Sequence, residues 1–99
     1  MRLDERTLKI IKLLAEKYFG QYCEVRIFGS RVNDTKRGGD IDIYVKTDLN
    51  DDVLEKKASF LAELKMKIGD QKIDLIVENT KNPEKGSIYE IARTTGIKI

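Results

Sequence analysis

The stretch FGSRVNDTKRGGDIDIYV, residues 28–45, joins two apolar runs through a glycine-rich segment. The first run ends at Gly29, and the second begins at Asp40, after which acidic and apolar side chains alternate. Alternation with a period of two predicts a β-strand over residues 40–46. The composition of residues 34–39 predicts a loop. The stretch therefore predicts two strands joined by a polar, glycine-rich connection.

The predicted strand carries two acidic residues on one face. Asp40 and Asp42 lie roughly 6 to 7 Å apart there, because side chains two residues apart in a strand point the same way. Ile41, Ile43 and Val45 then form the other face, as expected for a core. Like charges repel and aspartate is a poor strand former, so a positive group is expected beside the pair. A magnesium ion, held by carboxylates and phosphates, meets that need. A solvated strand end is the alternative.

A third carboxylate follows on a later strand. Asp74 is the acidic residue of the predicted strand 72–77, whose other residues after Lys72 are apolar. A carboxylate in such a strand is expected to have a partner. If this strand neighbours the strand 40–46, Asp74 completes a three-carboxylate group. A salt bridge from Asp74 to Lys72 or Lys46 is the alternative.

Gly29, Ser30 and Arg31 mark the end of the first predicted strand. A glycine at a strand end lets the backbone approach a ligand closely. Ser30 can cap a short helical turn that extends to about Asn33, and helix N-termini bind phosphate through free N–H groups. Arg31 either adds a phosphate contact or is an ordinary surface charge. Gly-Ser alone indicates a plain turn, but its position one loop before the Asp pair favours a phosphate site.

The remaining elements are predicted from apolar periodicity and from capping residues. The predicted order is helix 4–19, strand 23–29, turn, strand 40–46, helix 51–68, strand 72–77 and helix 88–95. The expected N-terminal caps are Asp4, Asn50 and the capping-box pair Ser87 and Glu90, and the expected C-terminal stops are Gly20, Gly69 and Gly96. The inner stripe of helix 51–68 is expected to be Leu54, Ala58, Leu61, Leu64 and Ile68.

This order predicts an α/β (α+β) fold with a small mixed sheet of three to five strands and helices packed on it. Residues 1–99 are expected to form a single domain. The chain has 19 basic and 17 acidic residues, so its charge does not favour a nucleic-acid partner. Cys23 is the only cysteine, which favours a reducing, cytoplasmic location. No apolar run approaches the roughly 18 residues of a membrane span. The absence of histidine excludes His-based zinc sites and Ser-His-Asp triads.

These residues resemble a known family. Gly29-Ser30, nine intervening residues and Asp40-Ile41-Asp42 are similar to the signature of the polymerase-beta-like nucleotidyltransferases. Asp74 falls where that superfamily has its third carboxylate, and residues 88–96 resemble the closing helix of its minimal members. The spacer of nine residues departs from the frequent ten, in a loop where a change of length is tolerated.

The resemblance implies a polymerase-beta-like nucleotidyltransferase core and a two-metal nucleotidyl transfer. Asp40 and Asp42 would hold two magnesium ions, and Asp74 would bind the catalytic metal and orient or deprotonate the acceptor hydroxyl. Gly29 and Ser30 would hold the β and γ phosphates of ATP.

The resemblance also implies a partner protein. Minimal nucleotidyltransferases are often antitoxins encoded beside a HEPN-domain ribonuclease, and some transfer AMP to a tyrosine of that toxin. We therefore expect ATP- and magnesium-dependent AMP transfer to a HEPN partner, in a homo- or hetero-oligomer. The alternatives are an antitoxin that neutralises its partner by contact alone, nucleotidyl transfer to a small molecule or RNA, and a purely structural α/β protein.

Overall fold

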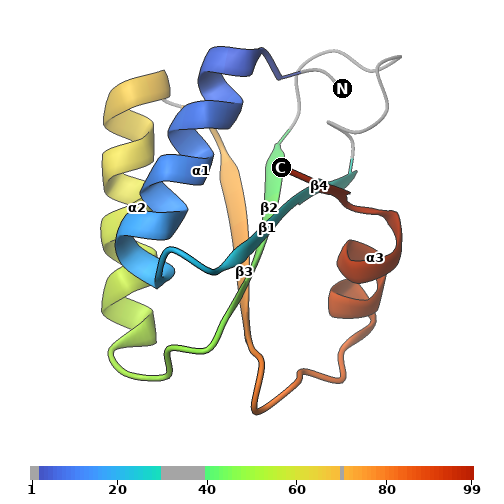
Figure 1. Cartoon of the computed structure of the whole chain (residues 1–99). Helices are drawn as coiled ribbons and strands as arrows, with labels where there is room; N and C mark the ends of the chain where they lie inside the picture. Colours follow the sequence, from blue (N-terminus) through green and yellow to red (C-terminus); the bar gives the residue numbers. More distant parts are fainter. Residues whose placement is uncertain (1–2, 30–39, 70) are drawn as a thin grey trace.

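The computed structural model describes residues 3–29, 40–69 and 71–99 (Figure 1). Ser30, Arg31, the predicted turn to Asn33 and the predicted loop 34–39 lie outside the described residues. The described elements are α1 (Glu5–Phe19), β1 (Glu24–Phe28), β2 (Ile41–Thr47), α2 (Val53–Ile68), β3 (Ile73–Asn79), α3 (Ser87–Thr95) and β4 (Ile97–Lys98).

The four described strands form one mixed sheet in the order β3-β2-β1-β4. β2 pairs with β3 in parallel, whereas β1 pairs with β2 and with β4 in antiparallel fashion. The predicted α+β fold with a small mixed sheet is therefore confirmed. β4 was not predicted, because a strand of two residues leaves no periodic pattern in the sequence.

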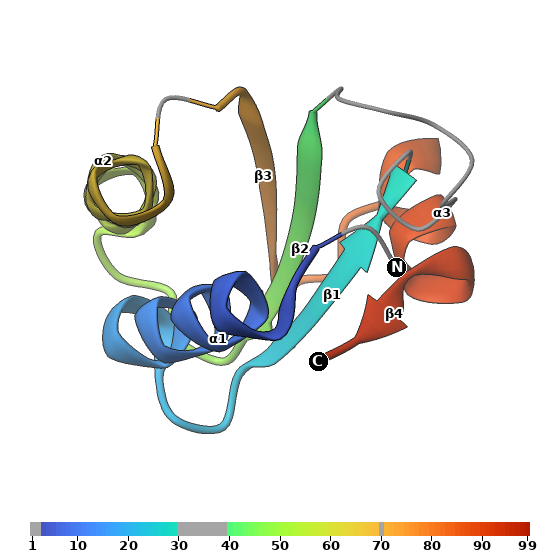
Figure 2. The same cartoon turned by 90° about the horizontal axis from the view of Figure 1, so that it is seen from above.

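Helices cover both faces of the sheet. Figure 2 shows α1 and α2 on one side of the strands and α3 on the other. The main core lies beneath α1 and α2, where β2 contributes Ile41, Ile43 and Val45, all fully buried. The predicted inner face of this strand is thus confirmed. A second, smaller cluster of buried residues lies beneath α3 and contains Phe28, Tyr44 and Ala92.

The predicted caps of two helices were wrong. α2 begins at Val53 after Asp52, which has φ 52° and makes no side-chain capping hydrogen bond, so Asn50 does not cap the helix. α3 begins at Ser87 after Gly86, again without a side-chain cap. Because Ser87 is already the first helical residue, it occupies the wrong position for a capping box with Glu90. In α1, by contrast, the Asp4 carboxylate accepts a hydrogen bond from the Thr7 N–H at 2.8 Å, as predicted.

The predicted inner stripe of α2 was also wrong in part. Leu54 is 81% exposed and Ala58 is exposed, whereas Phe60 and Leu64 are fully buried. The Phe60 ring packs against the ring of Phe19 in α1, with the centroids 5.9 Å apart. The helix therefore turns the face with its largest apolar side chain toward the core, because that orientation removes more apolar area from water.

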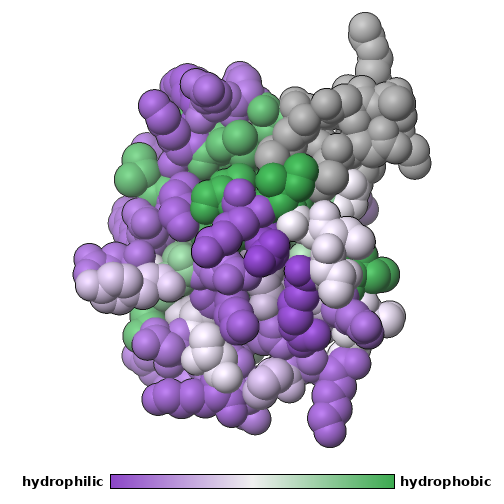
Figure 3. Space-filling view, turned by 45° about the vertical axis from the view of Figure 1, so that its right-hand side comes forward, coloured by the Kyte–Doolittle hydropathy of each residue, from purple (hydrophilic) through white to green (hydrophobic). Residues whose placement is uncertain are grey.

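Much of the molecular face drawn in Figure 3 is hydrophilic. Figure 3 shows the side turned toward α3, where hydrophobic side chains gather only in separate areas. Large apolar residues that are exposed on α3 and β4 are Ile88, Ile91 and Ile97. No helix in the described ranges is long and apolar enough to span a membrane.

Candidate active site

The starts of β2 and β3 bring three carboxylates and one lysine onto the same sheet face. Asp42 lies directly opposite Asp74 in the parallel pair. At the first residue of β2, the Ile41 N–H donates to the carbonyl of Lys72, one residue before β3, at 3.0 Å, which extends the pairing toward Asp40. Because side chains two residues apart in a strand point the same way, Asp40 and Lys72 share the face of Asp42 and Asp74. The condition stated for a three-carboxylate group, that the strand of Asp74 neighbours the strand of Asp42, is therefore met.

α3 covers the next pair of side chains on this face and leaves the carboxylates accessible. Tyr44 is fully buried and Ile76 is partly buried beneath α3, where they pack with Ala92. Asp42 is half-buried and Asp74 is exposed. The open part of the face therefore lies at the starts of the two strands, where a ligand can reach the carboxylates.

The end of β1 approaches the same carboxylates. Phe28, the last residue of β1, lies opposite Asp42, and Gly29 follows with φ 75°. A Cβ atom on Gly29 would lie 2.0 Å from Oδ2 of Asp42, a distance that no side chain can occupy. Glycine is therefore required here both for its backbone conformation and for the space that it leaves beside the carboxylate.

The carboxylates perturb one another. The pKa of Asp42 is raised from its usual 3.8 to about 6, first by burial and then by repulsion from Asp74 and Asp40. A hydrogen bond with the Asp74 side chain raises this pKa further, whereas the positive charge of Lys72 lowers it. Without a bound cation, the ionised form of Asp42 is thus disfavoured at this position.

Lys72 pairs with Asp40 and not with Asp74. The distance from Nζ of Lys72 to Oδ2 of Asp40 is 3.5 Å. The alternative in which Lys72 forms a salt bridge with Asp74 was therefore wrong. In the residues that the structure covers, no three acidic, cysteine or histidine side chains already converge on a point that could hold a metal ion.

The residue types nevertheless fit a hard divalent cation. Three carboxylates offer the oxygen ligands that magnesium prefers. The raised pKa of Asp42 reflects its burial first and then its repulsion from Asp74 and Asp40. The Gly29 backbone lies against this group without a side chain in the way. Asp40, Asp42 and Asp74 are the residues that would hold a metal ion, and Gly29 lies beside them.

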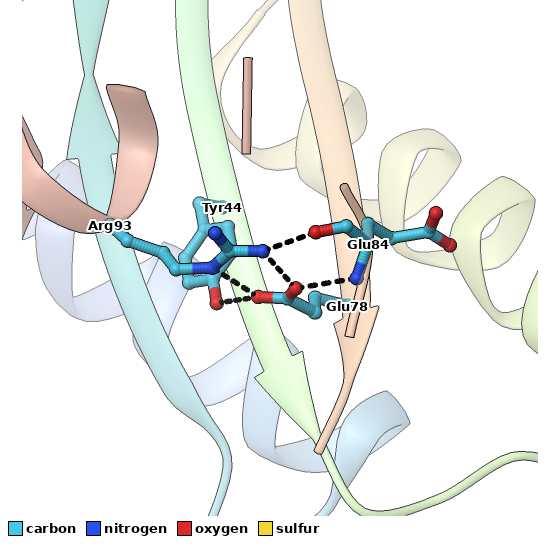
Figure 4. A network of polar contacts seen from close by, with 4 residues as sticks. All are labelled: Tyr44, Glu78, Glu84 and Arg93. Carbon is cyan, nitrogen blue, oxygen red and sulfur yellow. Dashed lines mark hydrogen bonds and ion pairs between the residues drawn. The ribbon is translucent and has the colours of Figure 1, made fainter. Parts of the chain in front are cut away.

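The largest charged network beneath α3 was not anticipated from the sequence. The Glu78 side chain is 1% exposed, and its Oε1 accepts hydrogen bonds from the Tyr44 hydroxyl at 2.5 Å and from Nε of Arg93 at 2.9 Å (Figure 4). Oε2 pairs with Nη2 of Arg93 and accepts the backbone N–H of Glu84 at 2.8 Å. The Arg93 guanidinium also donates to the Glu84 carbonyl at 2.6 Å.

This network fixes α3 and the preceding turn to the sheet. The hydrogen bonds from Arg93 are the main cause that lowers the pKa of Glu78 from 4.5 to about 2, against the opposing effect of burial. The role of Glu78 was not predicted, because the strand was expected to end at residue 77, whereas β3 continues to Asn79. An acidic residue directly after the apolar run 75–77, followed by an arginine on the last helix, was the available signal in the sequence.

A cavity of about 470 Å³ lies at the other ends of β2 and β3. It is lined in part by Thr47, Leu49 and Asn79, and none of the three carboxylates lines it. Its polar groups serve the fold: the Thr47 hydroxyl donates to the Phe19 carbonyl at 2.6 Å, and the Asn79 amide donates to the Leu49 carbonyl at 3.1 Å. This cavity and the three carboxylates therefore lie at opposite ends of the β2–β3 pair.

Comparison with known families identifies the class. A sequence model described as the nucleotidyltransferase domain matches residues 8–97, a range that includes all three carboxylates and Gly29. The chain therefore belongs to the nucleotidyltransferase domain family, whose members use a nucleoside triphosphate and a divalent metal ion. A search of curated proteins found no significant match.

Proposed function

We propose that this protein transfers AMP from ATP to a partner protein in a magnesium-dependent reaction, with residues 1–99 forming one nucleotidyltransferase domain. The observation that supports this proposal best is the parallel register that sets Asp42 opposite Asp74, with the Gly29 backbone against the Asp42 carboxylate. A plain surface turn would not require a glycine at that contact.

Each residue of the site has a proposed role. Asp40 and Asp42 hold two magnesium ions, and Asp74 helps to hold one of them. Gly29, with Ser30 and Arg31, binds the β and γ phosphates. When bound, the metal ions supply positive charge that balances the phosphates and favours the reactive form of the acceptor hydroxyl.

The proposed reaction is a displacement at the α-phosphorus of ATP. The acceptor oxygen forms a bond to that phosphorus, and the bond between the phosphorus and the α,β-bridging oxygen breaks. Pyrophosphate leaves, and AMP stays attached to the acceptor. Asp74 lies on the exposed side of the carboxylate group, so it can accept the hydroxyl proton from an acceptor that arrives from solvent.

The proposed acceptor is a tyrosine of a HEPN-domain toxin, which makes this chain its antitoxin. The likeness to minimal nucleotidyltransferases supports this assignment. The exposure of Asp74 supports it as well, because α3 packs over Tyr44 and Ile76 and not over this carboxylate.

Mass spectrometry tests the proposal directly. The chain is incubated with its HEPN partner, ATP and magnesium, and each modified tyrosine should gain the mass of one AMP unit. Asp42→Asn and Asp74→Asn should abolish the gain. Asp51→Asn is the matched control, because Asp51 is exposed and pairs with Lys56 at 3.3 Å, away from the site.

Two outcomes would contradict this function. If wild-type chain and partner form a complex but no mass is gained, the proposed transfer is wrong. If Asp42→Asn still neutralises the toxin completely, neutralisation occurs by contact and not by AMP transfer.

A further inference from the structure

Lys72 stands out among the charged side chains near the carboxylates because the proposed reaction does not use it. Its position before β3 puts it beside Asp40, on the side of β2 opposite to Gly29. We propose that Lys72 is a movable counter-ion of the site, which pairs with Asp40 while no divalent cation is bound and contacts the triphosphate once the cation has replaced it. This inference rests on the proposed function.

The backbone of Lys72 is held by a hydrogen bond within the sheet, whereas most of its side chain is exposed to solvent. The Lys72 carbonyl accepts the Ile41 N–H at 3.0 Å, so its main chain belongs to the start of the parallel pair. Its side chain, however, is 74% exposed, against 36% for Asp40. The ammonium group is therefore exposed to solvent on a backbone that the sheet holds in place.

The ion pair is weak enough to be exchanged. A separation of 3.5 Å between an exposed ammonium and a half-exposed carboxylate is typical of surface ion pairs, which contribute little to stability. A divalent cation has twice the charge of the ammonium and prefers carboxylate oxygens. We therefore infer that the cation displaces the ammonium from Asp40.

The displaced ammonium of Lys72 would move toward the phosphates of the bound nucleotide. A bound cation repels it, whereas a triphosphate attracts it, and the flexible lysine stem permits the move. Gly29 reaches Asp42 from β1 and Lys72 reaches Asp40 from β3. The two residues would thus hold a triphosphate from opposite sides of β2.

Substitution of Lys72 separates this role from a purely structural one. Without nucleotide, Lys72→Gln should bind Mn²⁺ several-fold more tightly than wild type, because the competing ammonium is gone. The same variant should bind ATP with magnesium several-fold more weakly, because a phosphate contact is lost. Lys72→Arg keeps the positive charge and should restore nucleotide binding.

Isothermal titration calorimetry on the folded full chain measures both affinities. Lys81→Gln is the control, because Lys81 is exposed in the turn after β3 and outside the carboxylate group. If Lys72→Gln changes both affinities in the same direction, or neither of them, the counter-ion role is wrong. If wild type binds neither Mn²⁺ nor ATP with magnesium, the proposed nucleotidyl transfer is wrong too. Binding by wild type therefore separates a failure of the counter-ion role alone from a failure of the proposed function.

Discussion

At the scale of single residues, Gly29 is a position where a side chain is poorly tolerated. Its φ of 75° favours glycine, and an added Cβ would meet the Asp42 carboxylate at 2.0 Å. We predict that Gly29→Ala lowers transfer activity at least tenfold, because the carboxylate must move. It should also lower the free energy of unfolding by about 2 to 4 kcal/mol, from backbone strain and from overpacking. Activity assays and urea denaturation measure the two effects.

Gly69 is the matched control for this substitution. It has φ 98°, but nothing lies within 4 Å of the position of an added Cβ. Gly69→Ala should therefore show the backbone strain of about 1 kcal/mol without the loss of activity. Equal effects of the two substitutions would mean that the contact with Asp42 is unimportant.

Asp42 is expected to reduce the stability of the metal-free protein. Its pKa is raised from 3.8 to about 6, so the folded state binds more protons than the unfolded state between these values. Stability should therefore fall as pH rises through this window and stay lower above it. We predict that Asp42→Asn stabilises the metal-free protein at pH 7 by about 1 kcal/mol, a value discounted for the exposure of the group.

Thermal unfolding with a chelator present tests this effect. Asp48→Asn, at an exposed position in the turn after β2, is the control and should change little. A loss of stability in Asp42→Asn would show that the carboxylate contributes a favourable interaction without metal.

At the scale of elements, the Glu78–Arg93 network determines how firmly α3 covers the sheet. The pKa of Glu78 falls from 4.5 to about 2 in the folded state. Its stabilising effect is therefore fully present above about pH 4.5 and is lost as pH falls toward 2. We predict a loss of about 2 to 3 kcal/mol across this window. Denaturation at a series of pH values measures it.

A pair of variants isolates this contribution. Glu78→Gln removes the titrating group, so the free energy of unfolding should fall less steeply as pH decreases from 4.5 to 2, the acid limb of the stability profile. The same variant should be less stable than wild type at pH 7. Glu84→Gln should leave the limb unchanged, because Glu84 joins the network through its backbone N–H and carbonyl (Figure 4). An unchanged acid limb in Glu78→Gln would assign the acid sensitivity to other groups.

The N-termini of α1 and α2 should respond in opposite ways to glycine. Asp52 has φ 52° and makes no capping hydrogen bond, so Asp52→Gly should raise stability by about 0.5 to 1 kcal/mol. Asp4 caps α1 through Thr7, so Asp4→Gly should lower stability by a few tenths of a kcal/mol. Differential scanning calorimetry compares the two, and a loss of stability in Asp52→Gly would show an unrecognised role of that carboxylate.

At the scale of the whole molecule, ligand binding should be visible as stability. A ligand that binds only the folded state stabilises it by about 2.7 kcal/mol at a hundredfold excess over Kd. For a chain of this size we predict a rise in Tm of about 10 °C with ATP and magnesium. The same rise should be absent in Asp42→Asn. No shift in wild type at millimolar ligand would favour a structural role without nucleotide binding.

Some of the site was predictable because it depends on local periodicity. The alternation in residues 40–46 placed Ile41, Ile43 and Val45 in the core and Asp42 on the other face, and the structure confirms this. Asp74 was predictable as a candidate third carboxylate because it interrupts an apolar strand, whereas the pairing of its strand with β2 comes from the structure. The ion pair of Lys72 with Asp40 was not predictable, because it depends on which residues of the two strands lie in register.

By itself, the sequence determined the fold class, the buried face of β2 and the residues that can supply carboxylate ligands. These features follow from patterns within a few residues of one another. Only the tertiary structure decided that Phe60 faces the core, that Glu78 holds α3 through Arg93, and that Gly29 must lie against Asp42. Each of these contacts joins residues that are distant in the chain, so their energies depend on packing and register, which a local pattern does not contain.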